Sequence, residues 1–178
     1  MVPLEKYPKV QTTDTLRAVI IIMDSTQIEV DGKLSLPRVV LVFDEHQELR
    51  GMARRRDVLR GLEPKFLVDK EASSEREWIH VKVDPNLAVL SYGHSISQIL
   101  QNAQRPISSV MSPVTTTLSS DDHLLKIMNV LVEQNLSVLP VLDAGKVIGV
   151  IRTADVFRYI AKALFLIGPD TSSSHARK

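Results

Sequence analysis

The chain has 178 residues, of which 44% are hydrophobic and 24% are charged. These values are typical of globular proteins and exclude a chain that is disordered throughout. The formal net charge is +1, with 22 basic against 21 acidic residues, so no overall field draws the chain to nucleic acid or to an anionic membrane. The absence of cysteine excludes disulfides, thiol catalysis, iron–sulfur clusters and cysteine-based zinc sites.

The chain shows no signal for export or membrane insertion. Its first ten residues carry prolines and charges where a signal peptide needs an apolar core. The longest apolar runs, residues 18–23 and 163–168, are far shorter than the roughly 20 residues of a membrane span. We therefore expect a cytoplasmic protein that does not enter the membrane.

Residues 1–62 are expected to form a first structural repeat. Apolar residues at helical spacing predict a helix within 12–23, and a β-branched run predicts a buried strand over 39–43. Between them, residues 27–35 predict an inserted loop or small hairpin. A polar turn, a short apolar run that begins at Gly51 and a second helix complete the repeat.

Residues 63–105 form an inter-repeat segment that is long for a plain linker. Apolar and polar residues alternate over 79–83, which predicts a strand. Apolar residues recur at helical spacing over 96–103, which predicts a helix. At the other end of the chain, the polar residues 168–178 predict a disordered tail.

Residues 106–167 are expected to form a second repeat. A helix is predicted within 119–134, followed by a buried strand over 138–142, a polar turn and a short apolar run. Thr153 is the predicted cap of the final helix. The apolar face of that helix is predicted to comprise Val156, Phe157, Ile160, Ala161, Leu164 and Phe165.

The two repeats match each other around a glycine. Aligning Gly51 with Gly149 superimposes four further pairs of identical residues: Arg54 with Arg152, Asp57 with Asp155, Val58 with Val156 and Arg60 with Arg158. A self-match of this length indicates a duplicated structural unit. Because strands alternate with helices, we predict an α/β (α+β) fold with two β-α-β-β-α repeats.

Residues 110–160 resemble a cystathionine-β-synthase (CBS) domain. The resemblance is carried by the Met-Ser-Pro entry, the Leu-Pro-Val-Leu-Asp strand and the Gly-x-x-x-x-x-Asp turn into a helix. Residues 16–62 resemble a divergent first copy. The resemblance implies a tandem pair, or Bateman module, packed with pseudo-two-fold symmetry and usually a homodimer. It also implies two clefts that commonly bind AMP, ADP, ATP or S-adenosylmethionine.

The resemblance implies which residues contact the ligand. Asp155 takes the position of an aspartate that binds the ribose hydroxyls, and Asp57 is its partner in the first copy. The second copy is the expected stronger site. The resemblance assigns two stretches to the base: Leu139, Pro140 and Val141 on the lining strand, and Val114, Thr115 and Thr116 on the first strand of the repeat.

Arginine replaces a serine or threonine that touches phosphate in most members of this family. The replaced positions are Arg54 and Arg152. Because guanidinium binds phosphate oxygens through paired donors, both arginines are candidate phosphate contacts, together with Arg55 and Thr153. The alternative is that the arginines around Arg54 form a solvated face that pairs with acids such as Glu45 and Glu48.

The sequence favours a regulatory module over an enzyme. It lacks a G-x-S-x-G elbow, a Walker loop and a G-x-G-x-x-G motif, and its histidines are not at metal-ligand spacing, so we predict no catalytic residue, metal site or prosthetic group. We expect an adenine nucleotide or S-adenosylmethionine in the cleft between the repeats, with occupancy transmitted to a partner protein. The alternatives are a ligand-free dimerisation or interaction scaffold, and an enzyme with its site in residues 63–105, a segment that shows no nucleophile–base pair.

Overall fold

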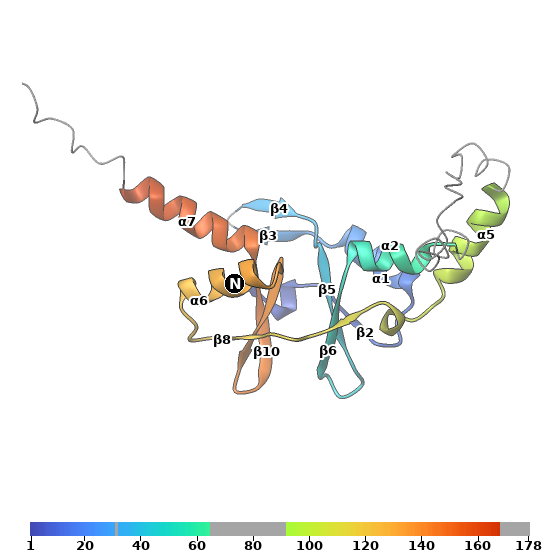
Figure 1. Cartoon of the computed structure of the whole chain (residues 1–178), viewed down its shortest axis with the longest axis horizontal. Helices are drawn as coiled ribbons and strands as arrows, with labels where there is room; N and C mark the ends of the chain where they lie inside the picture. The colour runs from blue at the N-terminus through green and yellow to red at the C-terminus, as the bar shows by residue number, and fades with distance from the viewer. Residues whose placement is uncertain (31, 65–91, 168–178) are drawn as a thin grey trace, which may run out of the picture. The chain divides into compact units, whose positions relative to one another are not determined.

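The computed structural model describes residues 1–30, 32–64 and 92–167 (Figure 1). The chain divides into two compact units, each with its own four-stranded sheet. The first-repeat unit comprises Pro8–Val114. The second-repeat unit comprises Met1–Tyr7 together with the chain from Thr115 onward. The repeats expected from the sequence are continuous in the chain. In the structure, Met1–Tyr7 belongs instead to the second-repeat unit, and the chain up to Val114 belongs to the first-repeat unit.

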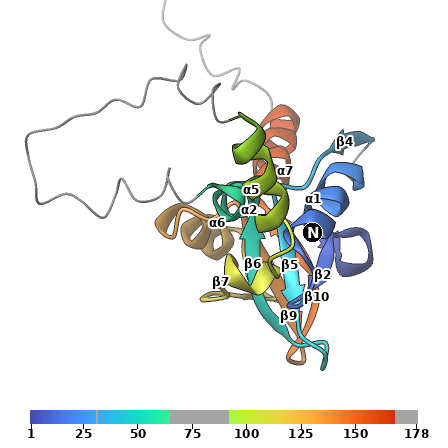
Figure 2. The same cartoon turned by 90° about the vertical axis from the view of Figure 1, so that its right-hand side faces the viewer.

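The sheet of the first-repeat unit has the strand order β2-β5-β6-β7. Strand β2 is parallel to β5, and the other neighbours are antiparallel. Helix α5 packs against α2 (Figure 2), and the Asn102 side chain donates to the carbonyl oxygens of Leu62 and Glu63 at 3.2 and 3.0 Å. The elements are β2 (Lys9–Gln11), α1 (Leu16–Ser25), β3 (Ile28–Val30), β4 (Lys33–Ser35), β5 (Val39–Phe43), β6 (Leu49–Arg54), α2 (Arg55–Leu62), α5 (Tyr92–Asn102), the 3-10 turn η2 (Ile107–Ser109) and β7 (Ser112–Pro113).

The sheet of the second-repeat unit has the order β1-β10-β9-β8. Strand β8 is parallel to β9, while β1 and β9 are antiparallel to β10. The elements are β1 (Val2–Pro3), the 3-10 turn η1 (Leu4–Lys6), β8 (Leu118–Ser119), α6 (Leu124–Glu133), β9 (Val138–Asp143), β10 (Lys146–Arg152) and α7 (Thr153–Ile167).

Both units are built on the same crossover. A helix joins two parallel strands, α1 between β2 and β5 and α6 between β8 and β9 (Figure 1). Parallel neighbours require such a crossover, because a tight hairpin reverses the direction of the chain. All five residues of β5 are buried, as expected for a strand covered on both faces. The predicted α/β class with two β-α-β-β-α repeats is confirmed.

Each unit has its own apolar core. The buried residues of the first-repeat core are Val10, Leu16, Val19, Met23, Val40, Val42, Ala53, Val58 and Ile107. The buried residues of the second-repeat core are Leu118, Ile127, Leu131, Leu139, Val141 and Val156. In both cores, helix residues spaced three or four apart pack against every second residue of a strand. This is the spacing of apolar residues that the sequence displays.

Each sheet has an edge strand that lies in a Met-x-Pro segment, which sequence reading recognised only at residues 111–113. Pro3 of β1 lies opposite Gly149, and Pro113 of β7 lies opposite Gly51. A Cβ at Gly51 would stand 2.7 Å from the Ser112 carbonyl oxygen, and one at Gly149 would meet the Val2 carbonyl oxygen. The paired glycines are therefore required by the close approach of the entry strands.

The structure confirms some of the local predictions and contradicts one of them. The insertion at 27–35 contains the hairpin β3–β4, and the helix predicted over 96–103 corresponds to α5. The cap assigned to Thr153 was wrong, because α7 already begins at Thr153, and the backbone N–H of the preceding residue, Arg152, donates the capping bond to Asp155. The strand predicted over 79–83 and the tail over 168–178 lie outside the described residues.

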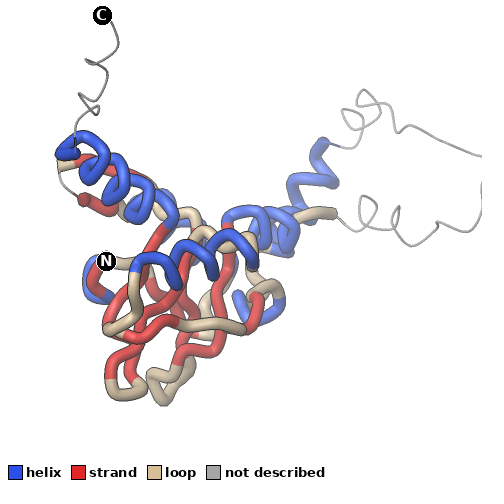
Figure 3. The backbone as a smooth tube through the Cα atoms, turned by 60° about the vertical axis from the view of Figure 1, so that its left-hand side comes forward, coloured by secondary structure: helices blue, strands red, loops and turns tan. Residues whose placement is uncertain are grey.

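The apolar face predicted for the last helix was too wide. Val156 is buried and Ile160 packs against the core, but Phe157, Leu164 and Phe165 are 76%, 66% and 87% exposed. At about 100° per residue the predicted set spans half of the helix circumference, so only one edge of it meets the sheet. Figure 3 shows α7 extending away from the strands of its own sheet.

Substituting Gly149 with alanine is expected to destabilise the chain by about 1–3 kcal/mol, because the new methyl group must displace the β1 backbone. Urea unfolding measures the change. The control is the same substitution in a chain that begins at Leu4, where the Val2 carbonyl is absent and the added cost should fall. An equal cost in both backgrounds would show that β1 does not set the requirement for glycine.

Candidate functional site

Each repeat turns from its sheet into a helix through an arginine. Strand β6 ends at Arg54, directly before α2, and β10 ends at Arg152, directly before α7. An aspartate follows three residues later, in the first turn of the helix. The Arg54 backbone N–H donates to Asp57 Oδ2 at 3.0 Å, and the Arg152 backbone N–H donates to Asp155 Oδ2 at 3.2 Å. These bonds satisfy a backbone donor at the helix start and place the carboxylate at the positive end of the helix dipole.

The arginine side chains bind the same carboxylates. Arg54 Nε lies 2.8 Å from Asp57 Oδ2, and its Nη2 lies 3.1 Å from Oδ1. Arg152 Nε lies 2.9 Å from Asp155 Oδ2, and its Nη2 lies 2.6 Å from Oδ1. Both pairs are bidentate, which is the strongest arrangement that guanidinium and carboxylate form. The structure thus brings together the arginine and the aspartate that the sequence marks in each repeat.

The two pairs differ in burial. The side chains of Arg152 and Asp155 are 10% and 9% exposed, whereas those of Arg54 and Asp57 are 41% and 9% exposed. Removing one partner of a buried pair costs about 3–5 kcal/mol, because the remaining charge is left without compensation. An arginine that reaches solvent is instead rehydrated when it leaves its partner, and exposed pairs contribute about 0–1 kcal/mol. The Arg54 pair is therefore the easier one to open.

Tyr7 lies beside the buried pair. Tyr7 directly follows η1 in the chain, and η1 packs against β10. The residue is 3% exposed. Burial raises the pKa of the Tyr7 hydroxyl, the charge of Arg152 lowers it and the charge of Asp155 raises it further. The pKa of Arg152 is raised, chiefly by its hydrogen bond to Asp155. At neutral pH, Tyr7 is thus an uncharged phenol whose pKa is affected by the charges of both members of the pair.

Asp57 stays ionised although it is buried. Burial raises the pKa of its carboxyl group, but the side-chain and backbone hydrogen bonds of Arg54 outweigh that effect, and the charges of Arg54 and Arg56 add to them. The net result is a lowered pKa. At neutral pH, Asp57 is therefore an acceptor-only group in a cationic environment.

The residues predicted to line the base occupy strand β9. Leu139 and Val141 are buried in the core of the second-repeat unit. Because successive side chains of a strand point to opposite faces, Pro140 faces away from that core. The side chains of Leu139 and Val141 thus serve packing. Contact with a ligand at this strand remains a prediction.

The first-strand assignment of Val114, Thr115 and Thr116 was wrong. These residues lie between β7 and β8, in the connection where the chain passes from one unit to the other. Thr116 Oγ1 is 2.6 Å from Gln134 Oε1. The single predicted strand is divided in two because Ser112–Pro113 pairs with β6 and Leu118–Ser119 pairs with β9.

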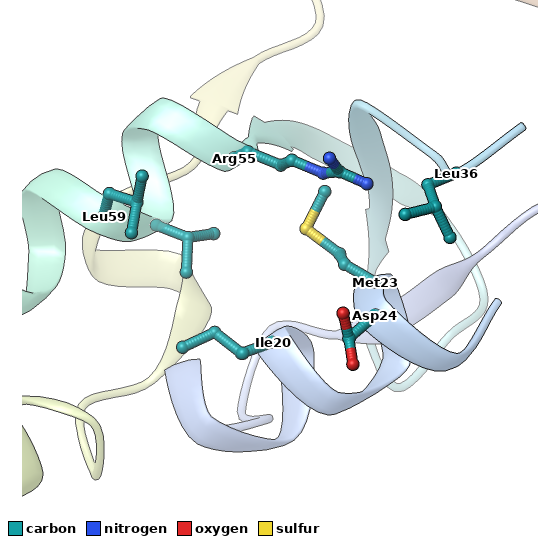
Figure 4. Close-up of a pocket in the computed structure, with 7 residues that line it drawn as sticks. Ile20, Met23, Asp24, Leu36, Arg55 and Leu59 are labelled. Carbon is teal, nitrogen blue, oxygen red and sulfur yellow. The ribbon is translucent and has the colours of Figure 1, made fainter.

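Other arginines of the predicted cluster separate into different environments. Arg50 lies 2.6 Å from Asp44 and 3.2 Å from Glu48, which confirms for this residue the alternative of a paired surface face. Arg55 is exposed and lines a groove between α1 and α2 (Figure 4). Thr153 is exposed, and its backbone N–H donates to the Ser137 carbonyl oxygen at 3.0 Å.

Sequence analysis missed Tyr7 as a neighbour of this turn. The available signal was the match between Met1-Val2-Pro3 and Met111-Ser112-Pro113. The segment at 111–113 pairs with β6 of the first repeat. The matching segment at 1–3 takes the equivalent place in the second repeat, where it pairs with β10.

Two further classes of site were tested on the described residues. Within them, no three histidine, aspartate or glutamate side chains are grouped so that they could hold a metal ion. In the same part of the chain, every helix is too short or too polar to cross a bilayer.

Comparison with known proteins identifies the architecture. A family model of the CBS domain matches residues 107–162. The CBS-pair protein CBSX2 from Arabidopsis thaliana is similar with a TM-score of 0.60 and 16% identity, covering 92% of each chain. The chain contains a CBS domain and has the fold of a tandem CBS pair. The CBS domain of a membrane protein from Sphaerobacter thermophilus is similar to this CBS pair with a TM-score of 0.60 and 21% identity, over 89% of this chain and 87% of that one.

Two similar structures hold nucleotides. CBSX2 in complex with AMP resembles this CBS pair with a TM-score of 0.57 and 17% identity, covering 92% of this chain and 93% of that one. The cytosolic domain of the Mg²⁺ channel MgtE in complex with ATP gives a TM-score of 0.54 and 15% identity, over 86% of this chain and 45% of that one. No curated protein sequence matches significantly.

In this CBS pair, Asp155→Asn is expected to cost about 3–5 kcal/mol of folding free energy, because it leaves the buried Arg152 without a counter-charge. Asp57→Asn is expected to cost about 1 kcal/mol, because Arg54 can turn to solvent. Urea unfolding of both variants measures the difference. Asp143→Asn, at an exposed aspartate, is the matched control and should change little. Equal losses for Asp57 and Asp155 would refute the unequal burial of the pairs.

Proposed function

We propose that this CBS pair is a regulatory module that binds an adenine nucleotide or a related ligand and transmits its occupancy to a partner protein. The observation that carries the proposal is the duplicated turn in which an arginine and an aspartate meet at a helix start. The AMP and ATP complexes of structures with the same fold support the ligand class.

The chemistry of the turn suits a nucleotide. An ionised carboxylate accepts hydrogen bonds only, and the two vicinal hydroxyls of ribose donate them. A guanidinium group donates paired bonds to phosphate oxygens. Because the arginine ends a strand and the aspartate begins a helix, a ligand that moves their hydrogen bonds acts on the junction between the two elements. Binding and its transmission require no catalytic step.

Nucleotide binding is expected to raise the melting temperature. At a concentration of about 100 times Kd, the ligand should stabilise the chain by about 2.7 kcal/mol. Thermal shift with AMP, ADP, ATP and S-adenosylmethionine tests this, with adenine and inorganic triphosphate as separate controls for the base and the phosphates. Asp143→Asn should respond like the wild type. If none of the four ligands moves the transition, the sensing function is lost.

A ligand-free scaffold is the second candidate, and one observation favours it. Both aspartates already accept hydrogen bonds from arginine, so each turn is satisfied without a ligand. Under this alternative the chain would form its complexes identically with and without nucleotide.

We infer that the chain forms a homodimer through its helix faces. Leu59 of α2 and Phe157 of α7 occupy corresponding positions in the repeats, and they are 62% and 76% exposed. In the first-repeat unit, the groove beside Leu59 has a volume of about 240 Å³, which suits an apolar side chain of a second copy (Figure 4). The groove is lined by Ile20, Met23, Asp24, Leu36, Arg55, Val58 and Leu59.

The dimer is tested by light scattering after gel filtration. Leu59→Glu and Phe157→Glu place a charge on the helix faces and should yield monomers, because burying an unpaired carboxylate is unfavourable. His46→Glu adds the same charge to an exposed turn and should leave the dimer intact. A wild-type chain that elutes as a monomer at all concentrations would contradict the inference.

A further inference from the structure

We propose that the α1–α2 groove of the first-repeat unit binds the same groove of a second copy, with Asp24 of each chain opposite Arg55 of the other. The proposal rests on the homodimer proposed above, and it names which surfaces of the two copies meet. Such an interface is isologous, which means that both copies contribute the same patch. Asp24 and Arg55 are then the residues that determine which helix faces pair.

The groove carries one charge of each sign. Asp24 lies on α1, Arg55 begins α2, and the two side chains stand on opposite walls of the groove (Figure 4). Both residues are exposed. Within the part of the chain that the structure describes, neither side chain forms an ion pair. The guanidinium and the carboxylate are therefore available to groups of opposite charge on a second chain.

The remainder of the groove is apolar. Met23 and Val58 are buried beneath it, at 4% and 2% exposure, whereas Ile20 and Leu59 are 37% and 62% exposed. Ile20 precedes Asp24 by one helical turn on α1, and Leu59 follows Arg55 by one turn on α2. Ile20 thus stands across the groove from Leu59, and Asp24 stands across it from Arg55 (Figure 4).

A two-fold axis that runs along the groove matches both pairs at once. It places α1 of one copy on α2 of the other, so that Asp24 meets Arg55 and Ile20 meets Leu59 in both directions. A two-fold axis across the groove would instead set each charge against an apolar residue and leave it covered without a partner, which is unfavourable. Charge complementarity therefore fixes the orientation of the two copies.

The second repeat lacks this pair of charges. The equivalent pairing of β2 with β5 and of β8 with β9 aligns α1 with α6, so that Asp24 corresponds to Val132. The matched glycines align Arg55 with Thr153. Val132 is 75% exposed, and Thr153 is exposed. A contact between the first-repeat groove and the second-repeat face of another copy would cover both charges with residues that cannot neutralise them, so this contact is selected against.

Charge exchange between two copies of the full chain tests the proposal by analytical ultracentrifugation. Asp24→Arg and Arg55→Asp should each weaken the dimer about 100-fold or more, because each change sets like charges against each other. Mixing the two variants should restore a dimer that contains one copy of each, since one copy then presents two guanidinium groups and the other two carboxylates. Native mass spectrometry identifies this heterodimer. A chain that carries both changes should dimerise with itself, because its charge pair is only reversed.

Asp143→Arg and Lys146→Asp are the matched controls. They make the same charge changes at exposed residues that flank the turn between β9 and β10, and each should leave the dimer Kd within about threefold. Groove variants that dimerise as tightly as the wild type would overturn the proposal and leave the homodimer standing. The same conclusion would follow if the mixture and the double variant both stayed monomeric. A wild type that is monomeric at every concentration would instead contradict the homodimer itself.

Discussion

In each repeat, the junction between sheet and helix depends on a bidentate pair between an arginine that ends a strand and an aspartate in the first turn of the following helix. The pair occurs in both repeats with the same donors and the same acceptor oxygens. It joins sheet to helix, and under the proposed function its carboxylate is the group that would accept ribose hydroxyls. The cost of separating the pair is set by burial, so the Arg152–Asp155 pair is the harder one to open. The duplicated motif therefore contributes unequally to the stability of the two repeats.

The strand order of each sheet determines the position of its arginine–aspartate pair. In each unit the parallel crossover joins an edge strand to a central strand, and the hairpin partner of that central strand carries the arginine at its end. The Met-x-Pro entry strand completes the edge and closes tightly against a glycine. For the second repeat, the entry strand continues through η1 to Tyr7. The tyrosine that is affected by the charges of the Arg152–Asp155 pair therefore comes from the start of the chain.

The fold could be predicted from sequence because the duplicated features are periodic and local. The β-branched run of β5, the apolar stripes of α1 and α6, and the Gly-to-Asp spacing each depend on a few neighbouring residues. The pairing of Arg152 with Asp155 could not be predicted from the sequence, because a phosphate and a carboxylate satisfy guanidinium equally well. The burial of Tyr7 and the division at Val114–Thr116 depend on strand pairing between distant segments, which local patterns do not encode.

The most direct measurement is a pair of double-mutant cycles on folding stability, one for Arg54 with Asp57 and one for Arg152 with Asp155. We expect a coupling energy of about 3 kcal/mol or more for the buried pair, because both of its members are about nine-tenths buried. The other pair should couple by about 1 kcal/mol or less, because Arg54 reaches solvent. A coupling between Arg54 and Asp57 that equals or exceeds that between Arg152 and Asp155 would contradict the account.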